Sequence, residues 1–97
     1  MRKNLNVPRI EFSTLFDKHL RNASDEIKIA LQDALDLFKE DSNHPALRNH
    51  PLKEKFAGFR SIDVADDWRA IFKETISGDR KVIIFHMIGT HEDLYES

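Results

Sequence analysis

The sequence contains no cysteine among its 97 residues and no long apolar run. The absence of cysteine excludes disulfide bonds and thiolate metal sites. The longest uninterrupted apolar run, Val82 to Phe85, is far too short to span a bilayer. Residues 1–12 mix basic residues with isolated apolar ones, so they lack the apolar core of a signal peptide. We therefore expect a soluble, cytoplasmic protein with no membrane partner.

The sequence also lacks the excess of positive charge that is typical of nucleic-acid-binding proteins. Its net charge is −2, whereas neutralisation of phosphates by Lys and Arg normally dominates affinity for nucleic acids. The charges are nevertheless segregated: residues 1–21 and 44–60 are net positive, and residues 22–43 and 61–97 are net negative. If both basic blocks fold onto one face, they form a local positive surface, because charges beyond about 10 Å are largely screened. A solvated surface of mixed charge fits the pattern equally well.

The length and composition predict a single domain over residues 1–97. With 40% hydrophobic residues, a chain of this length buries one core and has no room for a second. No repeat or low-complexity tract interrupts it.

The first half of the chain predicts one strand followed by a helical hairpin. Val7 to Phe12 alternates loosely, and Pro8 confines this strand to an edge or to a strand start. Ser13 is a typical N-cap for a first helix, and Ser24 for a second one. The apolar stripe of the second helix recurs at helical spacing and comprises Ile27, Leu31, Ala34, Leu35 and Phe38.

The second half predicts three strands. After a connecting segment that is rich in His, Pro and Lys, strands are expected over Phe59 to Val64, Trp68 to Thr75 and Val82 to Ile88. The order βααβββ is typical of an α+β, two-layer fold in which a helical hairpin covers one face of a small antiparallel sheet. Because Asp63 alternates with apolar neighbours, we assign it to the opposite, open face. In the last strand both faces are mostly apolar, and a single bulge would exchange them.

Four short motifs gather chemically active side chains around the predicted sheet. They are His50-Pro51-Leu52, Gly58-Phe59-Arg60, Asp67-Trp68-Arg69 and Gly89-Thr90-His91. In this order and spacing, from about His44 to Tyr95, the chain resembles bacterial RelE-like toxins, and the YafQ-like branch most. The resemblance implies a RelE/ParE-like fold. It also implies the toxin half of a toxin–antitoxin pair, an endoribonuclease (mRNA interferase) that cuts mRNA in the ribosomal A site and is neutralised by a cognate antitoxin.

The resemblance also assigns residues. His50, Asp67, Trp68 and His91 fall on active-site positions of the family, and Tyr95 matches a C-terminal aromatic position. Two positions depart from the pattern, since this chain has Asp63 in place of a histidine and Met87 in place of an arginine. A missing arginine removes a group that stabilises phosphate charge, so the departure bears directly on catalysis.

These residues suit metal-free cleavage of RNA, in which the ribose 2′-hydroxyl is the nucleophile. Imidazole ordinarily titrates near pH 6.5 and so exchanges protons readily at neutral pH. We expect His91 to be the general acid and His50 the general base, oriented or assisted by Asp67, with Asp63 sharing that role. No cofactor is needed. A zinc site is not expected either, because the spacing of His44 and His50 fits no typical ligand pattern.

The remaining candidates would bind RNA. Arg60 or Arg69 is expected to replace the absent arginine, because a guanidinium grips a phosphate with two parallel hydrogen bonds. Trp68 and Tyr95 would stack on splayed bases. Lys53 and Lys55 would follow the phosphates.

Plainer interpretations remain open for several of these residues. Trp68 is, taken alone, more often a core or rim aromatic, and the stem of Arg60 can simply cover apolar surface. His50 before a proline can shape a loop, and His91 can hydrogen-bond the backbone. We interpret the other histidines, His19, His44 and His86, as structural.

Two other functions compete with the nuclease. One is a catalytically silent or gyrase-targeting, ParE-like relative that mainly binds an antitoxin or another partner. The other is a small interaction domain whose open sheet face binds a peptide.

Overall fold

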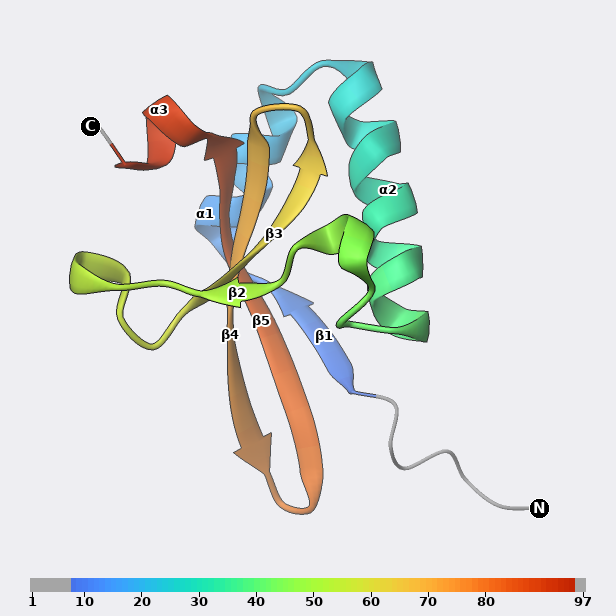
Figure 1. Ribbon diagram of the computed structural model, residues 1–97, viewed down its shortest axis with the longest axis vertical. Helices are drawn as coiled ribbons and strands as arrows, with labels where there is room; N and C mark the ends of the chain where they lie inside the picture. The colour runs from blue at the N-terminus through green and yellow to red at the C-terminus, as the bar shows by residue number, and fades with distance from the viewer. Residues whose placement is uncertain (1–7, 96–97) are drawn as a thin grey trace.

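The computed structural model describes residues 8–95, which form a five-stranded sheet with the two longer helices on one side (Figure 1). The predicted α+β class is confirmed, although Val7 of the first predicted strand lies outside the described residues. The strand order is β1-β5-β4-β3-β2. The elements are β1 (Arg9–Phe12), α1 (Thr14–Arg21), α2 (Asp25–Glu40), η1 (Pro45–Leu47), β2 (His50–Pro51), η2 (Glu54–Phe56), β3 (Arg60–Ala65), β4 (Trp68–Ser77), β5 (Arg80–Thr90) and α3 (His91–Tyr95).

Both predicted helix caps are present. The Ser13 hydroxyl accepts a hydrogen bond from the Phe16 amide at 3.0 Å, and the Ser24 hydroxyl accepts one from the Ile27 amide at 3.3 Å. The Ser13 hydroxyl also donates to the His86 carbonyl at 2.8 Å. One serine therefore begins α1 and fastens it to β5, since such a cap satisfies a backbone N–H that the helix leaves unpaired.

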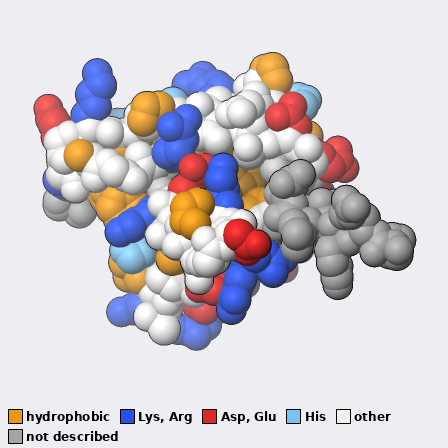
Figure 2. All heavy atoms as spheres, turned by 90° about the horizontal axis from the view of Figure 1, so that it is seen from below, with side chains coloured by type: hydrophobic (Ala, Val, Ile, Leu, Met, Phe, Trp, Pro, Cys, Tyr) orange, Lys and Arg blue, Asp and Glu red, His pale blue; other side chains and the backbone are white. Residues whose placement is uncertain are grey.

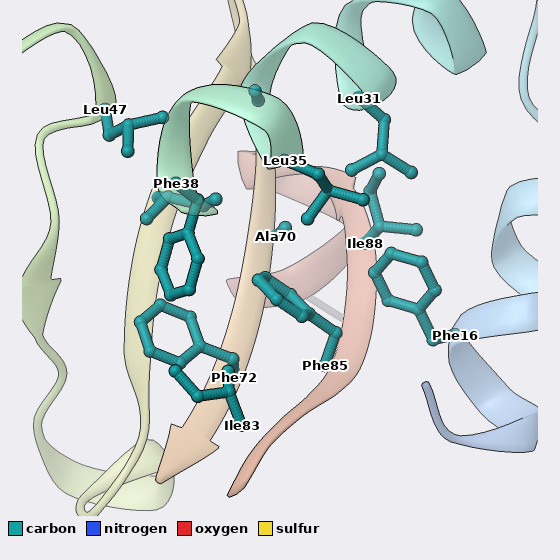
Figure 3. Packing of buried hydrophobic residues seen from close by; sticks show 12 residues of the cluster. Phe16, Leu31, Leu35, Phe38, Leu47, Ala70, Phe72, Ile83, Phe85 and Ile88 are labelled. Carbon is teal, nitrogen blue, oxygen red and sulfur yellow. The ribbon is translucent and has the colours of Figure 1, made fainter. Parts of the chain in front are cut away.

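The core lies between the helices and the sheet, as Figure 3 shows. Phe85 is in aromatic contact with Phe72, Phe38 and Phe16, with ring centroids 5.2, 5.6 and 5.9 Å apart respectively. The predicted stripe of α2 faces this core. The buried cluster comprises Phe16, Leu31, Ala34, Leu35, Phe38, Leu47, Ile62, Ala70, Phe72, Ile83, Phe85 and Ile88, and Ile27 packs against it half-buried.

The sheet is mixed, which corrects the expectation of a purely antiparallel sheet. β1 is an edge strand, as Pro8 indicated, but it pairs parallel to β5, with Arg9 opposite Val82 and Phe12 opposite Phe85. The helical hairpin of α1 and α2 follows β1 and packs on one face of the sheet. Parallel pairing is possible because the long stretch of chain between the two strands provides the crossover connection that it requires.

The β4–β5 hairpin is longer than predicted and carries a bulge. Its two strands extend well beyond the rest of the sheet, to a turn at Gly78, whose φ is 66° (Figure 1). Along the hairpin, Ile71 pairs with Met87 but Phe72 pairs with Phe85, so His86 is the extra residue. The bulge places Phe85 and Ile88 on the same face, and side-chain alternation alone does not predict this.

Four short elements were missed from the sequence, namely η1, β2, η2 and α3. β2 is only two residues long and ends in a proline, and α3 is a single short helix directly after β5. Neither is long enough to produce a periodic pattern. Within the described part of the chain, none of the helices has both the length and the apolar character needed to cross a membrane.

Candidate functional site

A polar cleft lies on the face of the sheet opposite the core, between the segment around β2 and helix α3. Its volume is about 560 Å³. Ser61 and Arg69 form its floor on β3 and β4, because they alternate with the buried Ile62 and Ala70. The cleft is lined by Arg48, His50, Pro51, Leu52, Lys53, Ser61, Arg69, His91 and Tyr95.

His50 is held at the sheet edge by its backbone and by its ring. It pairs with Ser61 of β3, and its ring Nδ1 lies 2.7 Å from the carbonyl oxygen of Arg48. A carbonyl oxygen only accepts, so Nδ1 carries the hydrogen. In neutral His50, Nε2 therefore has the free lone pair. Nε2 makes no hydrogen bond with residues 8–95. A general base requires such a nitrogen, which carries no hydrogen and whose lone pair is free to accept one.

The position of that carbonyl depends on an unusual backbone conformation. Arg48 ends η1 in the left-handed region, with φ 49° and ψ 46°. Its own N–H donates to the Pro45 carbonyl at 3.2 Å. A left-handed conformation is uncommon for a residue with a Cβ, and it turns the chain sharply from η1 into β2.

His91 enters the cleft from the first position of α3. Its backbone N–H donates to the carbonyl of Asp67 at 3.1 Å, which fixes the start of the helix against the β3–β4 turn. One helical turn later Tyr95 faces the same side, and the two ring centroids are 4.6 Å apart. Phe56 of η2 also contacts Tyr95, in a T-shaped arrangement with ring centroids 5.4 Å apart.

Helix α3 lies close against β5, and the space at position 89 has no room for a side chain larger than a methyl group. A Cβ on Gly89 would come within 3.4 Å of Asp93 Cβ and of a methyl group of Leu94. Leu94 is itself buried. The Gly89-Thr90-His91 motif therefore sets the distance between helix and strand, and with it the position of His91.

The phenol of Tyr95 is partly buried beside the floor of the cleft. Burial raises the pKa of its phenol above the ordinary value of 10.0, and this effect outweighs the Ser61 hydroxyl and the Arg69 guanidinium, which lower it. The Ser61 hydroxyl is buried and has no hydrogen-bond partner of good geometry among residues 8–95. Tyr95 is therefore a neutral phenol at physiological pH.

A single carboxylate joins two arginines behind the cleft. Asp63 Oδ2 lies 3.2 Å from Arg48 Nε, and Asp63 Oδ1 lies 3.1 Å from Arg69 Nε. Arg69 also donates from Nη1 to the carbonyls of Asp66, at 2.9 Å, and Trp68, at 3.3 Å. Both oxygens of Asp63 lie within ion-pair distance of a guanidinium, and the buried Oδ1 makes no hydrogen bond of good geometry with residues 8–95. A carboxylate between two cations suits positioning of the arginines better than removal of a proton, because the cations favour its charged form.

Five of the ten predicted site residues meet in the cleft, and five do not line it. His50, His91, Arg69, Lys53 and Tyr95 are brought together. Asp63 lies behind them, and Asp67 contributes a backbone carbonyl at the edge. Among the described residues, the carboxylate of Asp67 makes no hydrogen bond or ion pair with His50; the Arg48 carbonyl takes the orienting role instead.

Trp68 and Arg60 lie on the other face of the sheet, which corrects their predicted role in binding RNA beside His91. Trp68 shares its face with the buried Ala70 and packs against the core. Arg60 donates from Nε to Asn49 Oδ1 at 2.8 Å. Both positions follow from strict alternation along β3 and β4. Lys55 is also away from the cleft, with its ammonium 5.5 Å from the ring centroid of Phe56.

The three histidines that we interpreted as structural make contacts away from the cleft. His44 Nδ1 accepts from the Ala46 amide at 3.1 Å and caps η1. The ring of His86 stacks on Phe59 with centroids 5.2 Å apart. His19 Nδ1 accepts a long hydrogen bond, 3.5 Å, from the Ile88 amide.

Three cationic side chains, those of Arg48, Lys53 and Arg69, are among the residues that line the cleft. In the view of Figure 2, Lys and Arg side chains are interspersed with Asp and Glu. Among residues 8–95, no three His, Asp or Glu side chains are grouped so as to hold a metal ion. Sequence reasoning missed Arg48, whose only signal was its place in the basic block of residues 44–60.

The chain is similar in structure to several toxins. YafQ from E. coli strain BL21(DE3) is 27% identical with a TM-score of 0.69, covering 91% of this chain and 98% of that one. The toxin in an E. coli DinJ–YafQ toxin–antitoxin complex is 26% identical with a TM-score of 0.72, covering 92% of this chain and 98% of that one. A YoeB/ParE toxin from Agrobacterium tumefaciens shares the fold at 15% identity, with a TM-score of 0.67 over 86% of this chain and 98% of that one.

The family relationship rests on a wider match than any single motif. No curated protein sequence gives a significant match to this chain. The family model of YafQ, described as the bacterial toxin of a type II toxin–antitoxin system, matches residues 8–96. The chain therefore belongs to the YafQ family of type II toxin–antitoxin toxins.

Proposed function

We propose that this toxin is an mRNA endoribonuclease that acts in the ribosomal A site, in the cytoplasm, and that a cognate antitoxin neutralises it. The observation that carries the proposal is the cleft itself, which combines two histidines with basic side chains and an aromatic ring. The antitoxin is proposed because E. coli YafQ forms a complex with DinJ. The nuclease is supported by the chemistry of the residues in the cleft.

His50 is the proposed general base. Its Nε2 takes the proton of the ribose 2′-hydroxyl, whose oxygen then attacks the adjacent phosphorus. The Arg48 carbonyl fixes the ring orientation and stabilises the imidazolium that forms, because Nδ1–H continues to donate to it. Proton transfer by a positioned imidazole contributes about 10² to 10⁴ in rate.

His91 is the proposed general acid. It donates a proton to the leaving 5′-oxygen as the phosphorus–oxygen bond breaks, which yields a 2′,3′-cyclic phosphate and a free 5′-hydroxyl. Tyr95 packs against its ring and remains uncharged, so it offers a flat surface for a base without adding repulsion toward phosphate. Lys53 at the rim of the cleft provides a positive charge for a neighbouring phosphate.

The proposal is tested by primer extension on a defined mRNA held in initiated ribosomes. Wild-type protein should cut the mRNA, and His91→Ala should not, because the leaving oxygen then lacks a proton donor. Lys81→Ala, at the far end of β5, is a matched surface control and should cut normally. A ribosome-free reaction with the same mRNA measures ribosome dependence.

Two outcomes would contradict the proposal. Normal cleavage by folded His91→Ala would remove His91 from the mechanism. Growth arrest by wild-type protein that cuts no mRNA would favour the gyrase-targeting or catalytically silent alternative.

A further inference from the structure

The cleft needs a cation that can reach a phosphate, because Met87 offers no hydrogen-bond donor. Three guanidiniums lie on the elements around the cleft: those of Arg48, Arg60 and Arg69. They differ in how many of their N–H groups the protein itself already uses. A guanidinium has five such groups, so two facts decide which one can bind a ligand in the cleft: how many of the five are free, and whether the side chain lines the cleft.

Two of the three are unsuited, Arg60 because it does not line the cleft and Arg69 because the protein uses most of its donors. Arg60 donates from Nε to Asn49 and lies on the core side of β3. Arg69 donates from Nη1 to two backbone carbonyls, its Nε pairs with Asp63, and its side chain is only 18% exposed. Arg69 therefore contributes mainly a fixed positive charge to the floor of the cleft.

The guanidinium of Arg48 is held by one ion pair only among residues 8–95. Its Nε pairs with Asp63 at 3.2 Å, its side chain is 68% exposed, and it lines the cleft. Neither Nη group hydrogen-bonds to residues 8–95. Four N–H donors are therefore available at the rim of the cleft, close in sequence to the proposed base His50.

We infer that Arg48 is the phosphate-binding arginine of this toxin and that Asp63 is its positioning residue. The inference rests on the proposed function, since it takes RNA as the substrate. Arg48 binds the phosphate at the cleavage site through its two Nη groups, while Asp63 orients the guanidinium through Nε. The site thus replaces an arginine that the family carries on the last strand by one that lies beside the base.

The backbone of Arg48 supports this assignment. A left-handed conformation is held by an arginine here, where glycine or asparagine would adopt it with less strain. The same conformation turns the carbonyl toward His50 and the side chain toward Asp63. The left-handed conformation therefore supports both the contact of the Arg48 carbonyl with His50 and the ion pair with Asp63. Uncommon backbone conformations of this kind concentrate at functional positions.

The test measures binding of a 2′-O-methyl RNA oligonucleotide, which cannot be cleaved, as a function of salt concentration. Arg48→Asn keeps the left-handed backbone and removes the guanidinium. Arg80→Asn is the control, because it removes the same charge from the first residue of β5. His91 of the cleft follows the last residue of β5, so the length of the strand, at about 3.3 Å per residue, separates Arg80 from His91. We expect Arg48→Asn to bind about 10- to 100-fold more weakly at low salt and to lose about 0.7 from the salt slope. The Arg80 control should be nearly unchanged.

Two further variants separate positioning from general stability. Arg48→Lys should recover part of the affinity, because it restores the charge without the paired donors. Asp63→Asn should change RNA affinity by a different factor in wild-type protein and in Arg48→Asn, because the two side chains act as a unit. Equal factors in both backgrounds would overturn the positioning role of Asp63.

The outcomes also distinguish this inference from the proposed function. If wild-type protein binds RNA and Arg48→Asn behaves like the Arg80 control, this inference fails and the proposed function stands. If wild-type protein binds no RNA, on or off the ribosome, both fail.

Discussion

The ring Nδ1 of His50 lies 2.7 Å from the carbonyl oxygen of Arg48, two residues earlier in the chain. A backbone carbonyl cannot be removed by substitution of a side chain, and it stays an acceptor at every pH. The orientation of the proposed base is therefore built into the backbone, through the left-handed conformation of Arg48. In many metal-free sites a carboxylate performs this task, and here the sequence had suggested Asp67 for it.

We predict that neutral His50 is the Nδ1–H tautomer. Nitrogen-15 NMR of the labelled protein at a pH where imidazole is neutral should show Nδ1 with a pyrrole-type shift and Nε2 with a pyridine-type shift. Arg48→Gly, which favours the left-handed conformation, should keep this tautomer. Arg48→Val, which disfavours it, should yield a mixture of tautomers. A dominant Nε2–H tautomer in wild-type protein would contradict the assignment of Nε2 as the basic atom.

The fold was largely predictable because its main signals are local. Ser13 and Ser24 cap helices through contacts three residues away, and the stripe of α2 repeats at the helical period. The position of Trp68 was also within reach of the sequence. It alternates with Ala70 and Phe72, both apolar, so parity places it on the core face, where the structure has it.

The site was only half predictable, since its contacts are not local in sequence. Asp63 of β3 pairs with Arg48, which precedes β2, and with Arg69 of β4. No short sequence pattern predicts a cluster whose members come from three separate segments. The left-handed backbone of Arg48 gives no compositional signal either, because glycine and asparagine are the residues that normally mark it. The motifs contain the two histidines that meet in the cleft, and the tertiary structure decides what orients them.

The phenol of Tyr95 gives a pH-dependent contribution to stability. Its pKa is raised in the folded protein, so the neutral form is favoured there, and its contribution is complete below the unfolded-state pKa of about 10. It is lost as the pH rises through the higher folded-state value. Urea unfolding at pH 8 and above pH 10 should therefore show a smaller loss of stability at high pH for Tyr95→Phe than for wild-type protein. An identical loss in both proteins would mean that Tyr95 titrates equally in the folded and unfolded states.

Gly89 should tolerate one methyl group and no more. The Cβ of Gly89→Ala would lie 3.4 Å from Asp93 Cβ and from a methyl group of Leu94, which is ordinary van der Waals contact. We expect its stability and cleavage to stay close to those of wild-type protein. Gly89→Val should lower the free energy of unfolding by about 1 to 3 kcal/mol and reduce cleavage strongly, because overpacking displaces α3 and with it His91. Urea unfolding and the ribosome assay check both effects, and a fully active Gly89→Val would show that α3 need not lie close to β5.

An arginine at position 87, where the resemblance to YafQ-like toxins implies one, should compensate for the loss of Arg48. Met87 is not among the residues that line the cleft, but it is half-exposed and pairs with Ile71, on the same face of the sheet as Arg69. An arginine at position 87 would therefore extend from the face of the sheet that carries the cleft. We expect Arg48→Asn to cleave slowly, and we expect the double variant Arg48→Asn with Met87→Arg to recover much of the rate. The double variant with Met87→Lys should recover less, because a single ammonium cannot form paired hydrogen bonds with a phosphate. Initial rates in the ribosome assay, compared at equal protein stability, measure this rescue. Equal rescue by arginine and by lysine would mean that the cleft requires only a positive charge. The absence of rescue by either residue would mean that a side chain at position 87 does not reach the phosphate in this toxin.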